Sequence, residues 1–293
     1  MMKATKIVFS LILIFFLISF LFYKSYSSIF VRSIFANQPE EQKHLQGNEV
    51  LVSFLPLEQG EATLVQLANG KTYLIDTGNK NSSEQLLKLL HDHKVVQIKA
   101  ILLTNACDDH VGGFLDVLQE FHVEQIYLPE LIASSFSIPT SYQTKIKYLK
   151  KDDIEQWSQV KVTVLAPEEP LSLSPQDNSL VFQLTHQDIY FLFTSDIGDE
   201  IEKRVMKQYP LKSEILKVSD FGNNTASSLE FLEKVDPQVG IIFSSDQDLY
   251  QASQDVIDRL NETWTEVYEL SKVGEVQITS NGKDYQIEVI KGD

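Results

Sequence analysis

The sequence contains a single cysteine, Cys107, among 293 residues. An intramolecular disulfide is therefore impossible, and so is a structural zinc module built on two or more cysteines. Only 12 glycines and 9 prolines are present, which argues against long low-complexity linkers. Hydrophobic residues make up 43% of the chain, so an apolar core can hold a folded domain together.

Positive charge is also scarce in this chain. The chain has 25 basic and 41 acidic residues, which gives a net charge of −16. A surface of that sign repels phosphate backbones and keeps a protein soluble. Direct nucleic-acid binding is therefore not expected, because it depends on many Lys and Arg contacts with phosphate.

One long apolar run stands near the beginning of the chain. Residues 7–23 read IVFSLILIFFLISFLFY and carry no charge. As a helix they would span roughly 26 Å, slightly less than the ~30 Å hydrocarbon core, and snorkelling of Lys6 and Lys24 would close the gap. We expect an uncleaved transmembrane anchor after a short tail, residues 1–6. The alternative is a cleaved signal peptide, but no A-x-A cleavage site follows the run.

The anchor predicts the location of the rest of the protein. The chain would be a single-pass protein of the cell membrane that contacts the bilayer through its N-terminal helix. The distribution of Lys and Arg favours the N-terminus inside and the domain outside, in an extracellular position. Residues 24–48 show no clear period and end in a polar run, so we interpret them as a linker. The folded domain is expected over residues 49–293.

The folded part alternates short strands with helices. The turn Ala68–Lys71 contains Asn69-Gly70 between two apolar runs, which is a strong hairpin signal. Apolar runs predict strands at 52–57, 62–67, 72–76, 100–104, 125–129, 160–166, 179–184, 189–196, 214–219, 239–245, 267–270, 275–280 and 285–290. Helical spacing predicts helices at 83–93, 111–121, 198–209, 227–235 and 255–262. This order predicts an α/β fold of the α+β type, an αββα four-layer sandwich with two mixed sheets face to face.

Four segments, in order, resemble the metallo-β-lactamase superfamily, and within it the soluble domain of ComEC-type competence proteins. The first is FLPLEQGEATLVQ followed by TYLIDTG, and the second is AILLTNACDDHVGG. The third is NSLVFQL followed by IYFLFTSDIGDEIE. The fourth is ILKVSDFGNNTASSLEFLEKVDPQVGIIFSS. Because the four keep the family's order and spacing, the resemblance implies its fold over most of the chain after the linker.

The resemblance also implies a two-metal hydrolase site, in which histidines and carboxylates from the loops bind two ions and a water molecule. The family's His-x-His-x-Asp-His loop reads Asn105-Ala106-Cys107-Asp108-Asp109-His110 here. Asn105 and Cys107 thus replace two ligands, whereas Asp109 and His110 match theirs.

Three further acidic positions correspond to the family's site. Asp196 matches the carboxylate that bridges the two ions. Asp76 matches an acid that orients the loop rather than binding metal. In the fourth segment Asp220 and Phe221 replace the family's two histidines, and Ala252 or a neighbour replaces a late one. Of the six histidines in the chain, only His110 stands at a ligand position.

Two interpretations of the site remain open at this stage. Asp109, His110, Asp196 and Asp220 could bind one divalent ion, with Asp109 as a catalytic residue, and such an oxygen-rich set would favour Mn or Mg over Zn. Alternatively, the site holds no metal, with Asp109 capping the next helix and His110 bonded to Asp196.

Two functions correspond to these interpretations. The first is a membrane-anchored binding or interaction domain without two-metal hydrolase activity, whose protein partner is unknown. The second is a single-metal hydrolase, most plausibly a phosphodiesterase by family analogy. The resemblance alone also suggests an accessory role in DNA uptake, although the net charge argues against direct contact with DNA.

Overall fold

The structure is a computed structural model, and it describes residues 45–245 and 251–291. The folded unit is the segment Leu45–Asp293. The predicted tail, the anchor at 7–23 and most of the linker lie outside the described residues. Within the described ranges, no helix has both the length and the apolar character needed to cross a bilayer.

The first sheet has eight strands, and their sequence order differs from their spatial order. In spatial order they are β15 (Tyr285–Ile290), β14 (Glu275–Ser280), β1 (Val50–Phe54), β2 (Thr63–Leu67), β3 (Thr72–Ile75), β4 (Gln97–Leu102), β5 (His122–Pro129) and β6 (Ile146–Leu149). The strands from β15 to β3 pair antiparallel, and those from β3 to β6 pair parallel. The carboxyl ends of β3 and β4 therefore meet at one edge.

The second sheet has seven strands and is also mixed. In spatial order they are β13 (Glu266–Glu269), β12 (Val239–Ile242), β11 (Ile215–Lys217), β10 (Ile189–Phe193), β9 (Val181–His186), β8 (Val160–Ala166) and β7 (Ile154–Trp157). The strands from β13 to β10 pair parallel, and those from β10 to β7 pair antiparallel. Loops that follow β10 and β11 are therefore neighbours as well.

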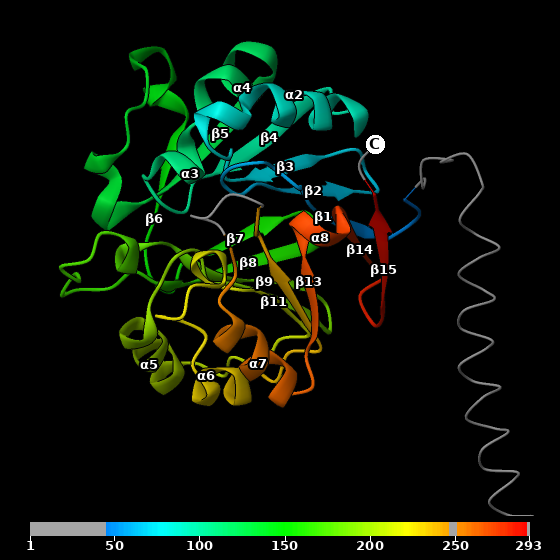
Figure 1. The fold of residues 1–293 in the computed structure, drawn as a ribbon. Helices are drawn as coiled ribbons and strands as arrows, with labels where there is room; N and C mark the ends of the chain where they lie inside the picture. Colours follow the sequence, from blue (N-terminus) through cyan, green and yellow to red (C-terminus); the bar gives the residue numbers. More distant parts are fainter. Residues whose placement is uncertain (1–44, 246–250, 292–293) are drawn as a thin grey trace, which may run out of the picture. The chain divides into compact units, whose positions relative to one another are not determined.

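Helices cover the outer faces of both sheets, as Figure 1 shows. The outer face of the first sheet carries α2 (Ser83–Asp92) and α4 (Phe114–Glu120), and that of the second carries α5 (Asp199–Gln208), α6 (Leu229–Val235) and α7 (Gln254–Glu262). Shorter elements are α3 (Asp108–Val111), α8 (Leu270–Val273) and the 3-10 turns η1 (Lys80–Ser82), η2 (Glu130–Ser135), η3 (Thr140–Lys145), η4 (Gln176–Asn178) and η5 (Asp220–Gly222). The predicted αββα arrangement, with two mixed sheets face to face and helices outside, is confirmed.

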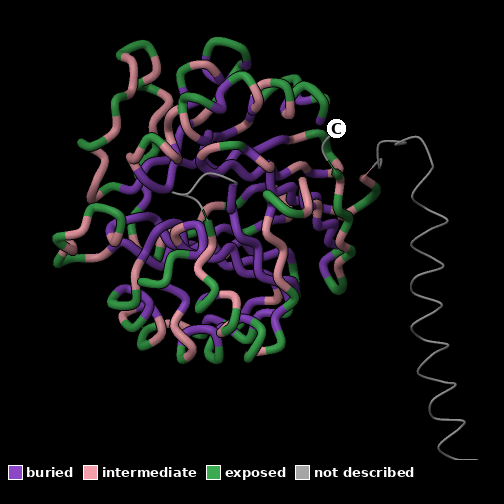
Figure 2. Tube along the Cα trace, viewed as in Figure 1, coloured by how far each residue is buried: buried purple, intermediate pink, exposed green. Residues whose placement is uncertain are grey.

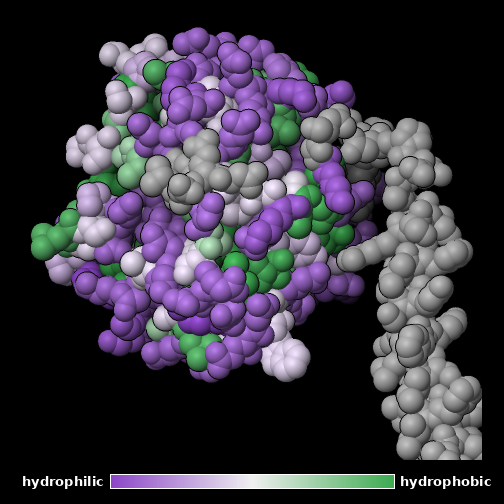
Figure 3. Space-filling view, in the orientation of Figure 1, coloured by the Kyte–Doolittle hydropathy of each residue, from purple (hydrophilic) through white to green (hydrophobic). Residues whose placement is uncertain are grey.

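Alternation along the strands explains this layering. In β10, Phe191 and Phe193 pack into the core between the two sheets, whereas Leu192 packs against the helices. Successive side chains of a strand point to opposite faces. An unbroken apolar run therefore places apolar side chains both in the core between the sheets and under the outer helices. Buried residues fill the space between the sheets (Figure 2), and hydrophilic side chains cover most of the face drawn in Figure 3.

The observed elements follow the sequence prediction closely, with one informative difference. The helix expected at 111–121 is α4, which begins only at Phe114, and a separate short helix, α3, ends at Val111, before Gly112 and Gly113. A Cβ atom on Gly112 would lie 2.1 Å from the backbone nitrogen of Lys80, and one on Gly113 would lie 2.4 Å from the carbonyl oxygen of Thr77. Two glycines thus let the loop after β3 approach the helix backbone.

Candidate functional site

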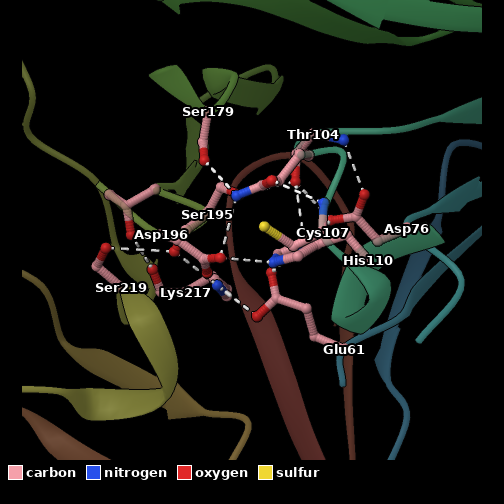
Figure 4. A network of polar contacts seen from close by, with 12 residues as sticks. Glu61, Asp76, Thr104, Cys107, His110, Ser179, Ser195, Asp196, Lys217 and Ser219 are labelled. Carbon is pink, nitrogen blue, oxygen red and sulfur yellow. Dashed lines mark hydrogen bonds and ion pairs between the residues drawn. The ribbon is translucent and has the colours of Figure 1, made fainter. Parts of the chain in front are cut away.

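The candidate site lies where loops from both sheets meet. Asp76 follows β3, His110 follows β4 within α3, and Asp196 follows β10. Glu61 precedes β2, and Lys217 is the last residue of β11. All five side chains are buried, and Figure 4 shows them directed toward one another.

His110 is the centre of this cluster. Its Nδ1 lies 3.0 Å from Asp76 Oδ2, and its Nε2 lies 2.8 Å from Asp196 Oδ2. A third carboxylate, that of Glu61, has Oε1 3.5 Å from Nδ1. Burial opposes a charged imidazole, but these three carboxylates outweigh it and raise the pKa of His110 well above its usual range. The three carboxylates therefore favour the protonated form of His110, in which both ring nitrogens can donate.

Asp76 holds the loop that carries His110. It accepts a hydrogen bond from the backbone nitrogen of Thr104 at 2.7 Å and another from the Thr104 hydroxyl at 2.6 Å. Asp76 itself has a φ of 57°, a left-handed conformation that non-glycine residues rarely adopt. Asp76 thus contacts Nδ1 of His110 and can fix the orientation of the imidazole ring, as carboxylates beside histidine ligands do.

Lys217 brings a second positive charge into the site. Its side chain is 2% exposed, and Nζ lies 2.5 Å from Glu61 Oε2. Nζ also donates to the backbone carbonyl of Ser195 at 2.9 Å. The rings of Phe221 and Phe243 lie with their centroids 6.0 and 5.9 Å from the ammonium, within the range of cation–π attraction. Lys217 is thus paired, hydrogen-bonded and flanked by aromatic faces.

Asn105 and Cys107 stand where the family has two metal ligands, and Asn105 forms hydrogen bonds with the backbone and with a neighbouring carboxylate. Asn105 Nδ2 donates to Asp196 Oδ2 at 3.1 Å and to the hydroxyl of Ser179 at 2.9 Å. Asn105 Oδ1 accepts from the backbone nitrogen of Cys107 at 3.0 Å. Cys107 is half-buried, and burial raises the pKa of its thiol. A thiol with a raised pKa is a weak nucleophile and a weak metal ligand.

Asp109 and Asp220, two of the four predicted ligands, are not members of the Glu61–His110–Asp196 group, although the charges of Asp196, Lys217 and His110 act on the carboxyl of Asp220. The carboxylate of Asp109 accepts a hydrogen bond from Asn79 Nδ2 at 2.8 Å. The alternative role of Asp109 as a helix cap does not match the geometry, since α3 begins at Asp108 with Cys107 at its N-cap. Asp220 begins η5, and burial together with the charge of Asp196 raises its pKa to about 6.

Several residues around the site have a strained backbone. Besides Asp76, three non-glycine residues near the site have a positive φ: Ser195 at 46°, Asp220 at 44° and Phe221 at 54°. Such conformations cost on the order of 1–3 kcal/mol each and tend to occur at functional sites. The strained turns direct the Ser195 carbonyl toward Lys217 and bring Phe221 beside it.

One cluster of three residues in the described part of the chain could hold a metal ion. One ligand atom each from Glu61, His110 and Asp196 lies within 4.8 Å of the others. Two oxygens of this set, Asp196 Oδ1 and Glu61 Oε2, are buried without a hydrogen-bond partner among the described residues, although Glu61 Oε2 forms an ion pair with Lys217. The set thus contains two of the predicted ligands, His110 and Asp196, and adds Glu61.

The contacts of these groups do not fit a bound divalent ion as they stand. A histidine coordinates through a nitrogen lone pair, but both nitrogens of His110 face carboxylates. Glu61 already forms an ion pair with the ammonium of Lys217. The cavity beside Glu61, Lys217 and Phe243 has a volume of about 10 Å³, barely enough for one water molecule. Burial also raises the pKa of Glu61 to about 7, against the opposing charges of Lys217 and His110.

Glu61 and Lys217 were absent from the residues selected from the sequence. Both lie inside quoted motifs, Glu61 in the run Gln59-Gly60-Glu61-Ala62 and Lys217 within a strand whose other residues are apolar. A lysine in a buried strand is rare unless it is paired. The presence of Lys217 in an apolar strand was therefore the sequence signal for a buried ion pair. His93 is a second buried pair of this kind: it follows the last residue of α2, is 8% exposed, and its Nε2 lies 2.8 Å from Glu275 Oε1.

Sequence comparison identifies the class of protein. Residues 55–245 match the family model of the metallo-beta-lactamase superfamily. The chain therefore belongs to that superfamily, and the arrangement of its loops at the strand ends is consistent with this membership.

Among curated proteins the chain is similar to competence proteins. It is 26% identical over 223 residues to ComE operon protein 3 of Bacillus subtilis, which covers 68% of this chain and 29% of that protein. It is 25% identical over 207 residues to competence protein ComA of Neisseria gonorrhoeae, covering 70% of this chain and 28% of that one. The chain is related to ComEC-type competence proteins, and the match spans less than a third of the length of these relatives.

Solved structures support the fold. The metallo-beta-lactamase fold protein YhfI from Bacillus subtilis aligns with a TM-score of 0.53 at 14% identity, over 75% of this chain and 95% of that one. Igni18, a metallo hydrolase from Ignicoccus hospitalis, aligns with a TM-score of 0.51 at 11% identity, over 78% of this chain and 98% of that one. At such identities the likeness concerns the fold alone.

Proposed function

We propose that this metallo-β-lactamase-fold domain acts as a binding or interaction domain and lacks the two-metal hydrolase activity of its superfamily. The observation that carries the proposal is the double engagement of His110. Its two nitrogens lie 3.0 Å from Asp76 and 2.8 Å from Asp196. As the site stands, each nitrogen of His110 faces a carboxylate oxygen rather than an open ligand position, and this supports a centre without two bound ions.

The supply of ligands supports the same proposal. A two-ion site needs about six to eight protein ligands around a shared water molecule. Phe221 and Ala252 offer none, and Asn105 offers only an amide oxygen, which accepts a backbone hydrogen bond here. Cys107 has a thiol whose raised pKa disfavours the coordinating thiolate. Too few donors remain to bind both ions.

The test measures metal content and turnover on the same protein. We expect the full chain, purified in detergent and dialysed against Mn, Mg or Zn, to retain less than one equivalent of metal. It should not hydrolyse bis-phosphodiester, DNA or lactam substrates. Metal-dependent turnover that disappears in both Asp109→Ala and His110→Ala would contradict the proposal.

The alternative is a single-metal hydrolase, most plausibly a phosphodiesterase. It is favoured by the proximity of Glu61, His110 and Asp196 within 4.8 Å and by the unpartnered Oδ1 of Asp196. Two carboxylates and one imidazole form an oxygen-rich set that suits Mn or Mg better than Zn. In this case one equivalent of Mn should bind, and Asp196→Ala should abolish both binding and turnover.

We further propose that residues 7–23 anchor the protein in the cell membrane with the domain outside. The uninterrupted apolar run supports this topology. Full-length protein should sediment with membranes, and protease added to intact cells should reach the domain. A soluble product shortened at its N-terminus would instead indicate a cleaved signal peptide.

The relatives' names suggest a process but no partner. Similarity to ComE operon protein 3 and to ComA supports an accessory role in competence. With a net charge of −16, the partner is more plausibly a protein than DNA. Loss of DNA uptake upon deletion, without any DNA binding by the purified chain, is the expected outcome.

A further inference from the structure

The eight-stranded sheet has an unprotected edge at β15. Its six residues all pair with β14 without a bulge, and no described strand lies beyond them. Figure 1 shows β15 at the margin of the sheet. Proteins commonly protect such edges with short strands, charges, prolines or bulges. β15 contains no proline and a single charge, that of Glu288, so it is open to pairing with another strand.

The other three sheet edges in the described residues are better protected. β6, β7 and β13 have four residues each. β6 and β7 are linked by an ion pair, in which Lys147 Nζ lies 2.6 Å from Glu155 Oε1. β13 begins and ends with a glutamate, Glu266 and Glu269, and charges on an edge discourage strand pairing. β15 is therefore the longest edge and the one with the fewest charges for its length.

The hydrogen bonds of the β14–β15 hairpin show which backbone groups face outward. The backbone nitrogen of Asn281 donates to the carbonyl oxygen of Asp284 at 3.1 Å, which closes the hairpin with a hydrogen-bonded pair. From there, pairs alternate between bonded and non-bonded along an antiparallel ladder. The position of Ile290 agrees, because its carbonyl oxygen would lie 2.3 Å from a Cβ on Gly274, at the start of β14. The alternation turns the N–H and C=O groups of three residues away from β14: Tyr285, Ile287 and Val289.

The same three residues carry the apolar side chains of this edge. Tyr285 and Ile287 are partly buried against the core between the sheets, and Val289 is 38% exposed. Because alternate residues of a strand share a face, all three side chains lie on one side of the sheet. A strand added at this edge would gain hydrogen bonds and cover apolar surface at the same time.

A second copy of β15 fits this edge in one register. In a two-fold dimer, residues directly opposite each other lie on the same face of the joined sheet, so one residue must lie opposite its own copy. With Glu288 at that position two like charges meet, and with Gln286 there Asp284 lies opposite Glu288. Like charges directly opposite each other are destabilising. With Ile287 at that position neither contact occurs, and all three outward residues find partners within the strand.

This register also pairs the side chains favourably. Ile287 lies opposite its own copy, and Tyr285 lies opposite Val289 of the second copy, an aromatic and β-branched pair of the kind that stabilises sheets. Each of these pairs exchanges two backbone hydrogen bonds. The only like charges that the register places opposite each other are Lys283 and Lys291, which lie outside β15.

We propose that the domain forms a two-fold dimer through β15, centred on Ile287, so that the eight-stranded sheets of two copies join into one. The inference goes beyond the proposed function and does not depend on the metal content of the centre. Each chain carries a net charge of −16, which repels the second copy at long range. Salt screens such repulsion, so the dimer should become tighter as salt is added.

Cysteine crosslinking of the full chain in detergent tests the register. Cys107 is first replaced by alanine, so that each variant carries one cysteine. Ile287→Cys should crosslink rapidly under mild oxidation, because a hydrogen-bonded pair has Cα atoms about 5.5 Å apart, within the range of disulfides. Glu288→Cys alone should stay uncrosslinked, because its two copies lie about 8 Å apart. It should crosslink when mixed with Gln286→Cys.

Two substitutions test the edge in a protein without added cysteines. Ile287→Pro removes an outward N–H and no bond to β14, so the domain should still fold. Val289→Lys places a charge on the edge. Each should weaken dimerisation at least about 10-fold in sedimentation equilibrium, the scale of one or two lost hydrogen bonds. Ile154→Lys, at a side chain 59% exposed on β7, is the matched control and should associate as wild type does.

The outcomes separate this inference from the proposed function. A monomeric wild type, or a dimer that both Ile287→Pro and Val289→Lys leave intact, would overturn the inference. So would Glu288→Cys alone crosslinking as fast as Ile287→Cys. If Ile287→Pro fails to fold, the effect of Val289→Lys decides. Bound metal with turnover would contradict the proposed function and leave the dimer standing.

Discussion

Replacing His110 by glutamine tests whether the buried charge network stabilises the domain. His110 is fully buried, and its partners Asp196 and Asp76 have side chains that are 4% and 2% exposed. Removing one member of a buried ion pair typically costs about 3–5 kcal/mol, since the other charge is left uncompensated. That is a large part of the roughly 5–15 kcal/mol by which proteins are stable. We expect His110→Gln to cost about 3–5 kcal/mol near pH 6.

His91→Gln provides a matched control for this measurement. His91 also pairs with a carboxylate, since its Nε2 lies 2.9 Å from Glu120 Oε1, but the two side chains are 54% and 45% exposed. Exposed pairs contribute about 0–1 kcal/mol because water screens them. Urea denaturation followed by tryptophan fluorescence, to which the buried Trp157 contributes, measures both variants.

The effect of His110→Gln should depend on pH with a definite sign. The pKa of His110 in the folded protein is raised well above 6.5, so the folded state holds its proton more tightly than the unfolded chain. The resulting stability is fully present below about pH 6.5, the unfolded value, and is lost as the pH rises through the folded pKa. The difference between wild type and His110→Gln should therefore shrink at alkaline pH. A cost below about 1 kcal/mol near pH 6, no larger than an exposed pair contributes, would refute the reasoning.

Three further predictions concern other parts of the domain. Gly60 and Gly70 have φ values of +79° and +78°, but a Cβ on Gly60 would lie 2.3 Å from a backbone oxygen, whereas nothing lies within 4 Å of one on Gly70. In thermal unfolding, alanine at Gly70 should cost about 1–2 kcal/mol and alanine at Gly60 clearly more. Trp157→Ala should cost about 3–5 kcal/mol, since the ring is buried, and Trp264→Ala, at a side chain 92% exposed, should change the stability by less than about 0.5 kcal/mol. Because the pKa of Asp220 is raised from 3.8 to about 6, stability should fall as the pH rises through that window, and Asp220→Asn should remove this slope in a pH series of urea midpoints.

Much of the fold could be predicted because the strands are long apolar runs. The strand expected at 160–166 is β8, residue for residue, and the Asn69-Gly70 turn joins β2 to β3 as an antiparallel hairpin. The segment 130–158 could not be resolved from the sequence. It forms two 3-10 turns and two edge strands, whose few buried residues leave no clear period.

The site was only partly predictable, for a physical reason. Motif positions identify the loops that meet at the strand ends, and His110 and Asp196 do contact each other there. Motif positions do not show which side chains then pair. Glu61 and Lys217 are separated by more than 150 positions in the sequence, and only the packing of the two sheets brings their charges together.

The pairing of β1 with β14 has a consequence for how the chain is made. Val50 pairs with Ser280. The strand β1, which is synthesised early, therefore cannot pair with β14 until the end of the chain has been made. At roughly 5–20 residues per second, ribosomes need on the order of 10–50 s to produce the intervening chain. During that interval the β14 side of β1 is an open strand edge, which readily pairs with other chains. Newly made molecules crowded on one messenger are therefore at risk of joining each other, and protection during synthesis should matter more for yield than the stability of the finished domain.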